Sequence, residues 1–179
     1  MNRKLSIEEL NRISQTEFKV AHKSGIAIVL DNIRSLSNIG SVFRTSDAFL
    51  IDKIFLCGIT ACPPHREINK TALGATDSID WKYEDDTLTA ISSLKAAGYK
   101  IFALEQAENS ISLLDIKVKL DEKIALVLGH EVNGVNQLVI DQCDGCIEIP
   151  QLGTKHSLNV ANSSAIAIWD IWSKKQKAQ

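Results

Sequence analysis

Five short runs of apolar residues recur along the chain, separated by segments with the residue pattern of helices. Such runs are typical of strands that are buried on both faces of a parallel sheet. The segments between them are long enough for the crossover connections that parallel pairing requires. The alternation predicts an α/β fold, with a mostly parallel sheet and helices on both faces. The runs are residues 26–30 (IAIVL), 53–58 (KIFLCG), 100–105 (KIFALE), 123–129 (KIALVLG) and 146–150 (CIEIP).

Capping residues and apolar periodicity place the helices between these strands. Ser6 and Glu9 have the offset of a capping box, Ser37 or Asn38 can cap a second helix, and Ser157 can cap the last one. Residues 1–179 are predicted to form one domain, with residues 1–24 as a helical extension and residues 59–71 as a loop. The predicted helices are residues 6–22, 39–49, 86–97, 135–142 and 157–175.

Composition narrows the possible classes of protein. Of 179 residues, 45% are hydrophobic, which suits one globular domain with a sizeable core. No apolar run approaches the roughly 20 residues of a membrane helix, and residues 1–10 lack the apolar centre of a signal peptide. We therefore expect a cytoplasmic protein that does not associate with membranes. The net charge of −2 means that any RNA binding depends on a local basic patch, or on one assembled across an oligomer.

The four cysteines could be zinc ligands or free thiols. Cys143 and Cys146 form a C-x-x-C pair, but Cys57 lies on an apolar strand and Cys62 follows five residues later. That spacing is poor for zinc. We expect free, mostly buried thiols and no metal site.

The first predicted strand is followed by small and charged residues at the start of a helix. Gly40 and Ser41 leave room for exposed backbone N–H groups, which suit a phosphate. Arg44 lies one helical turn beyond Gly40, on roughly the same face. The alternative interpretation is a capped helix in which Arg44 pairs with Asp47.

The fourth and fifth strands also end in polar loops, and ligands gather at the carboxyl ends of parallel strands. Gly129 and Gly134 flank Glu131, which could accept hydrogen bonds or lie solvated in a tight turn. Ser157 and Asn159 begin the last helix, where they could face a ligand or form a packing seam of small residues. Neither a Walker loop nor a G-x-G-x-x-G pattern is present, so familiar nucleotide-binding folds, including an NAD enzyme, are remote.

Together, three segments resemble the motifs of the SpoU (TrmH) family of RNA ribose 2′-O-methyltransferases, within the SPOUT superfamily. The segments are "NIGSVFRTSDAF" (38–49), "GHEVNG" (129–134) and "IPQLGTKHSLNVANSSA" (149–165). They occur in the family's order, and the match covers residues 26–173. The resemblance implies a C-terminal trefoil knot over roughly residues 100–175, a rare exception among folds. Threading a helix through a loop would explain the many small side chains there.

The resemblance also implies the cofactor, S-adenosyl-L-methionine, and a homodimer with its active sites near the interface. In this family, the knot loops hold the adenosyl group mainly through their backbone. This feature corresponds to Leu104, Gly129, Ile149 and Leu158 in this chain.

By the same resemblance, Arg44 contacts the ribose 2′-hydroxyl or the adjacent phosphate, and Asn38 holds Arg44 in place. Glu131, Ser157 and Asn159 shape the site. The expected RNA-binding residues are Arg34, Arg44, Arg66, Lys70 and Lys155.

The segments "NKTALGATDSIDWKYEDD" (69–86) and "CIEIPQLGTKHSLNV" (146–160) resemble enzymes that methylate the ribose of guanosine 18 in the tRNA D-loop. We therefore favour tRNA as the substrate. Methylation of rRNA or of the tRNA wobble nucleotide is an alternative, as is a dimer that binds RNA without catalysis.

Overall fold

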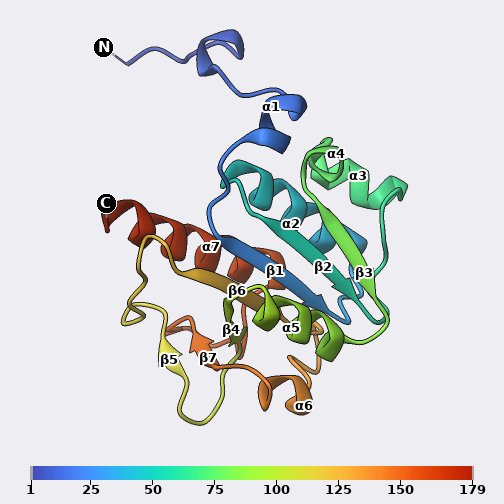
Figure 1. Cartoon of the computed structure of the whole chain (residues 1–179), viewed down its shortest axis with the longest axis vertical. Helices are drawn as coiled ribbons and strands as arrows, with labels where there is room; N and C mark the ends of the chain where they lie inside the picture. Colours follow the sequence, from blue (N-terminus) through green and yellow to red (C-terminus); the bar gives the residue numbers. More distant parts are fainter. Residues whose placement is uncertain (1, 179) are drawn as a thin grey trace.

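The computed structural model, which describes residues 2–178, contains a seven-stranded sheet in which every pairing is parallel (Figure 1). The strand order is β3-β2-β1-β6-β4-β7-β5, so β1 and β6 lie near the centre. The predicted mostly parallel α/β sheet is therefore confirmed. The strands are β1 (Ile26–Asp31), β2 (Lys53–Cys57), β3 (Trp81–Glu84), β4 (Tyr99–Leu104), β5 (Ile111–Ser112), β6 (Lys123–Leu128) and β7 (Gly145–Glu148).

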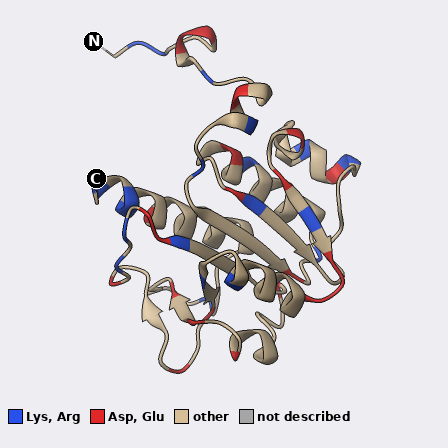
Figure 2. Ribbon diagram, in the orientation of Figure 1, with Lys and Arg blue, Asp and Glu red and all other residues tan. Residues whose placement is uncertain are grey.

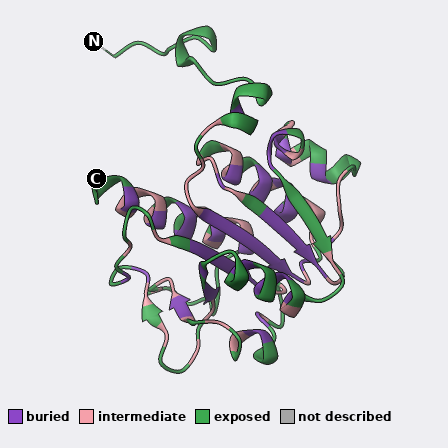
Figure 3. Ribbon diagram, viewed as in Figure 1, coloured by how far each residue is buried: buried purple, intermediate pink, exposed green. Residues whose placement is uncertain are grey.

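Helices cover both faces of the sheet, as predicted. On one face, α2 (Leu36–Ala48) and α7 (Val160–Lys177) share a core with alternate residues of β1, including Ile28 and Leu30, and α3 (Arg66–Ala72) packs against α2. On the other face, α5 (Thr87–Ala96) and α6 (Gln137–Ile140) pack on the intervening residues, Ala27 and Val29. All residues of β1 are buried, which explains why its first five residues, 26–30, are all apolar (Figure 3).

Two strands and two short helices, α3 and α4 (Ala75–Ser78), were missed by the sequence prediction. β3 is an edge strand whose sequence, WKYE, is mostly exposed, so it lacks an apolar run. β5 has only two residues. The predicted loop of residues 59–71 is wrong in part, because it contains α3, which His65 caps through its ring nitrogen. Edge elements bury too little surface to leave a strong pattern in the sequence.

The predicted continuous helix over residues 6–22 is also wrong. The chain forms a 3-10 turn (Glu8–Leu10), a break at Asn11, whose φ is 47°, and the short helix α1 (Gln15–Val20). The capping box of Ser6 and Glu9 is present, but Ser14 and Glu17 form a second one and start a new helix. This extension projects from the sheet and is mostly exposed (Figures 1 and 3). Within residues 2–178, no helix combines the length and apolarity needed to span a bilayer.

Candidate functional site

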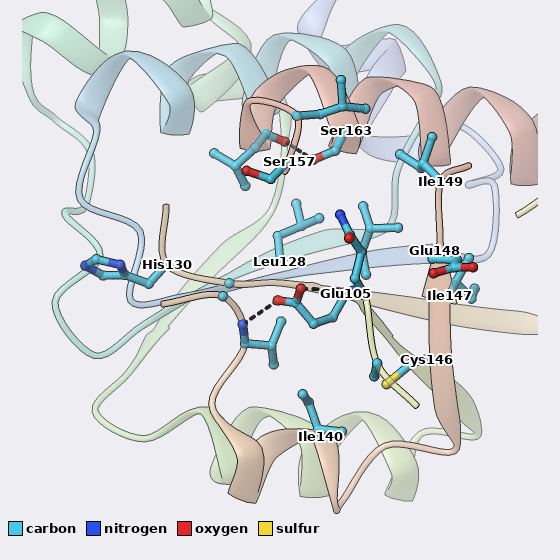
Figure 4. A pocket seen from close by; sticks show the side chains of 18 of the residues that line it. Glu105, Leu128, His130, Ile140, Cys146, Ile147, Glu148, Ile149, Ser157 and Ser163 are labelled. Carbon is cyan, nitrogen blue, oxygen red and sulfur yellow. Dashed lines mark hydrogen bonds between the residues drawn. The ribbon is translucent and has the colours of Figure 1, made fainter. Parts of the chain in front are cut away.

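A cavity of about 1100 Å³ lies at the carboxyl ends of β4, β6 and β7 (Figure 4). Three loops form its walls, residues 104–109, 128–135 and 148–159, together with the start of α7. Its position fits the rule that ligands bind beyond the carboxyl ends of parallel strands. The four positions expected to bind the adenosyl group, Leu104, Gly129, Ile149 and Leu158, all line it.

The loop after β6 is folded tightly onto itself. The backbone of His130 exchanges two hydrogen bonds with Gly134, with N···O distances of 3.1 and 2.8 Å. Gly134 has a φ of 67°, a conformation that favours glycine. A Cβ atom on Gly129 would lie only 2.1 Å from the nitrogen of Val135. The two glycines therefore let two stretches of backbone approach closely at the cavity wall.

Glu131 lies in this loop, and its carboxylate joins it to the loop that precedes α2. It accepts hydrogen bonds from the N–H groups of Arg34 (3.0 Å) and Ser35 (2.9 Å), and from the Asn38 amide (3.1 Å). Burial alone would raise the pKa of Glu131, but these three donors outweigh it and hold that pKa below its ordinary value. The tight turn of one interpretation is present and Glu131 is exposed, while its carboxylate accepts the hydrogen bonds of the other interpretation.

Asn38 and Asn159 extend this network to the last helix. The Asn159 amide donates to the Asn38 side-chain oxygen (3.2 Å), while its own oxygen accepts from the N–H groups of Ala161 and Asn162. Asn159 is thus the cap of α7, so the prediction that Ser157 caps a helix starting there is wrong. Ser157 lines the cavity instead. Three motifs distant in sequence meet at one cluster, Glu131–Asn38–Asn159.

The region around Arg44 corrects three further expectations. Asn38 does not hold Arg44, because its amide group is engaged with Glu131 and Asn159. Arg44 is exposed on α2, and no ion pair with Asp47 exists. Because α2 begins at Leu36, before the predicted start, the Arg44 side chain extends from its third turn.

Gly40 is not part of a phosphate site. It is buried where α2 meets α3, and a Cβ atom there would lie 2.2 Å from the carbonyl oxygen of Ile68 and 2.1 Å from the Thr71 hydroxyl. The Ser41 hydroxyl donates to the carbonyl of Ser37. Gly40 therefore serves close helix packing.

The predicted RNA-binding side chains all lie outside the cavity lining. All are exposed, and none takes part in the ion pairs found within residues 2–178. They are free to meet a polyanion. These residues are Arg34, Arg44, Arg66, Lys70 and Lys155.

Two cavity residues, Glu105 and Gln106, were missed by sequence reasoning. The Glu105 carboxylate accepts from the N–H of Val135 (3.0 Å), and the Gln106 amide donates to the carbonyl of His156 (2.7 Å). Neighbouring residues at the end of β4 thus connect it to both other cavity loops. Their position directly after a buried strand, the criterion that selected Glu131, was the available signal.

The cysteines stand apart from this network. All four are free thiols, and burial raises the pKa of Cys57 and Cys143 to about 12. Among residues 2–178, no cluster of His, Cys, Asp or Glu could hold a metal ion.

A parallel sheet with helices on both faces and a cavity at the carboxyl ends of its strands is typical of α/β proteins that bind a ligand. The model of the SpoU rRNA methylase family matches residues 25–169, which identifies the family within this class. The chain belongs to that family.

Relatives with names or structures agree with this assignment. A Staphylococcus haemolyticus protein, assigned to the TrmH family of tRNA/rRNA methyltransferases, is 27% identical over 87% of this chain. This chain spans only 62% of that relative's length. The Aquifex (A. aeolicus) TrmH/SpoU tRNA-modifying enzyme superposes with a TM-score of 0.80 at 19% identity, covering 91% of this chain and 81% of that one. An AdoMet-bound rRNA methyltransferase from Sinorhizobium meliloti superposes with a TM-score of 0.77 at 26% identity, covering 84% and 56%.

Proposed function

We propose that the protein is an RNA ribose 2′-O-methyltransferase that uses S-adenosylmethionine. The observation that carries this proposal is the junction of the three family motifs at one cavity, through Glu131, Asn38 and Asn159. Family membership and the AdoMet-bound Sinorhizobium relative support it.

The cavity suits this cofactor in size and chemistry. Its volume of about 1100 Å³ accommodates an adenosyl group with an amino-acid arm. Close-packed backbone at Gly129 and apolar side chains at Leu104, Ile149 and Leu158 would hold the adenosyl group. When bound, the cofactor supplies a methyl group activated by the positive charge on sulfur.

The protein's task is then alignment and proton removal. The residues of the site would hold the ribose 2′-oxygen in line with that methyl group, and the hydroxyl proton would pass to an acceptor as the oxygen is methylated. The Arg44 guanidinium has only hydrogen-bond donors and no acceptor, so it is a poor base. It anchors the ribose oxygen or its phosphate electrostatically. The Glu131 cluster keeps the loops in place around the reacting groups, and Ser157 lines the cavity beside them.

Exposed basic residues outside the cavity lining would receive the RNA backbone. Arg66 and Lys70 lie on α3, which packs against the helix that carries Arg44 (Figure 2). Arg34 adjoins Glu131 through its backbone, and Lys155 lies in the loop before α7. This arrangement explains how a chain with net charge −2 can bind RNA.

The favoured substrate is guanosine 18 of the tRNA D-loop, with rRNA as the alternative, and the site of action is the cytoplasm. Purified protein with labelled S-adenosylmethionine should transfer label to a ribose in unmodified tRNA. A tRNA whose target guanosine carries a 2′-deoxyribose should remain unlabelled. Label only on rRNA would contradict the tRNA assignment but keep the reaction. Cofactor binding without transfer to either RNA would favour a non-catalytic RNA-binding dimer.

The C-terminal segment forms a trefoil knot within residues 100–175. Contacts between α7 and the segment that joins β5 to β6 support this proposal. Lys174 donates to the carbonyl of Leu113, and Lys175 donates to that of Glu122. The N–H of Leu113 also donates to Glu148 at the end of β7. The connection that precedes β6 therefore lies across the helix that follows β7.

The active form is a homodimer that pairs through α7 and the end of α2. Three aromatic rings cluster there, with centroid distances of 5.3 to 5.7 Å among Phe49, Trp169 and Trp172. Trp169 is 54% exposed and Ile166, one turn before it on α7, is 42% exposed, so the helix presents an apolar surface beside this cluster.

Replacing Trp169 by aspartate should convert the dimer to a monomer, because the new charge would be buried without a partner. Sedimentation velocity measures the change. Val20→Asp is the matched control, since Val20 is 83% exposed on α1, away from this cluster. A wild-type protein that sediments as a monomer would contradict the dimer.

A further inference from the structure

The cavity lining has an uneven distribution of charge. Its residues include several carboxylates but neither lysine nor arginine, while the exposed basic residues lie outside. Two histidines are present, and the Nδ1 atom of one, His130, accepts hydrogen bonds from the N–H groups of Val132 and Asn133. Such a lining attracts a cation and offers no charge compensation to an anion. The carboxylates are Glu105, Glu108, Glu131, Asp141 and Glu148.

These carboxylates differ in how they are fixed. Glu131 and Glu108 are both exposed, but Glu131 is engaged with three donors in the junction of the loops. Glu105 is held by two backbone groups, since its Oε2 accepts from Val135 and its Oε1 accepts from Gln106 at 2.9 Å. A carboxylate has about four acceptor positions, so Glu105 has capacity for a ligand.

Glu105 is also fitted sterically into the cavity wall. A Cβ atom on Gly134 would lie 2.1 Å from its Oε2 atom, so the absence of a side chain there makes room for the carboxylate. Figure 4 shows Glu105 in the middle of the lining, hydrogen-bonded to the loop after β6 and facing the space below Leu128 and Ser157. The chain thus places a preorganised negative charge at the cavity.

We propose that Glu105 makes the cavity prefer the positively charged sulfonium cofactor over its neutral-sulfur product, S-adenosylhomocysteine. The inference rests on the proposed function. Methyl transfer removes the positive charge from sulfur, so the attraction to Glu105 is present before the reaction and absent after it. In a partly enclosed site this difference is larger than in water. Glu105 therefore helps the enzyme to bind fresh cofactor and to release product.

The test compares the affinities of the full chain for S-adenosylmethionine and S-adenosylhomocysteine, both measured by titration calorimetry. Glu105→Gln keeps an oxygen for the N–H of Val135 and nearly the same shape, but removes the charge. Binding of S-adenosylmethionine should weaken about tenfold, while binding of S-adenosylhomocysteine should change less than about twofold. Glu108→Gln is the matched control, because Glu108 lines the same cavity but its charge is exposed and screened by solvent. It should weaken S-adenosylmethionine binding by less than about twofold.

If Glu105→Gln weakens the binding of both ligands equally, the proposal is overturned and Glu105 only stabilises the loop. If it weakens the binding of neither ligand, the proposal is overturned as well. If Glu105→Gln does not fold, the wild-type protein decides the question with sinefungin, in which an amine-bearing carbon replaces the sulfonium. Wild-type affinity for sinefungin and S-adenosylmethionine should exceed that for S-adenosylhomocysteine, and equal affinities would contradict the proposal. If the wild-type protein binds none of the three, the proposed function fails instead.

Discussion

Replacing Arg44 by alanine should lower methyl transfer to RNA by about a hundredfold or more while leaving S-adenosylmethionine binding unchanged. Arg44 is exposed on α2, outside the cavity lining, so its loss disturbs no cavity wall. It makes no ion pair within residues 2–178, so its charge is available for a ribose oxygen or phosphate. Single-turnover transfer and a separate cofactor titration measure the two effects.

The matched control for Arg44 is Arg66→Ala on the neighbouring helix α3. Arg66 is equally exposed and is proposed to contact only the RNA backbone. Its loss should weaken RNA binding and reduce the salt dependence of that binding, with transfer restored at saturating RNA. Arg44→Ala should not be rescued in this way. Near-normal turnover by Arg44→Ala would remove Arg44 from the reaction and leave the cavity as a binding site alone.

The sheet was predictable because its central strands are buried on both faces. Residues 26–30 of β1 pack against helices on both faces of the sheet, so the apolar sequence IAIVL leaves few alternatives to a buried strand. The edge strand β3 is different, since Trp81 and Tyr83 are partly exposed and alternate with charged residues. Short edge elements are determined by their neighbours in space, which the local sequence does not record.

The residues of the candidate site could be predicted from the sequence, but the hydrogen bonds between them could not. Polar residues after buried strands, such as Glu131 and Asn159, could be selected because parallel strands bring their carboxyl ends together. Which side chain bonds which depends on loop geometry. Asn38 was therefore assigned to Arg44, although it lies 93 residues from its actual partner, Glu131.

The first residue of α7 was also not predictable from the sequence. Ser157 and Asn159 are both good caps, and the sequence alone does not decide between them. In the structure, the contact between Asn159 and Asn38 fixes the Asn159 side chain, and the helix begins directly after it. The tertiary contact with Asn38 therefore decides which of the two possible caps begins the helix.

Replacing Gly129 by alanine should lower the melting temperature by several degrees and abolish cofactor binding. The new Cβ atom would lie 2.1 Å from the nitrogen of Val135 and 2.2 Å from the carbonyl carbon of Gly134. Both are backbone atoms, so no side-chain rotation relieves the clash, and overpacking of this kind costs about 1–3 kcal/mol. In a chain of this size, each kcal/mol lowers the melting temperature by about 2–4 °C.

Cofactor binding should be lost because the loop displaced by the new Cβ atom forms part of the cavity. Residues 129–135 form one cavity wall and carry Glu131, whose carboxylate holds the N–H groups of Arg34 and Ser35. A shift of this loop would break the hydrogen bonds to Glu131 and would also change the shape of the cavity. Gly153→Ala is the matched control, because no atom lies within 4 Å of its Cβ position, and it should melt and bind as the wild type does. Wild-type melting and cofactor affinity in Gly129→Ala would mean that the backbone yields at no cost, and that the close approach does not hold the site together.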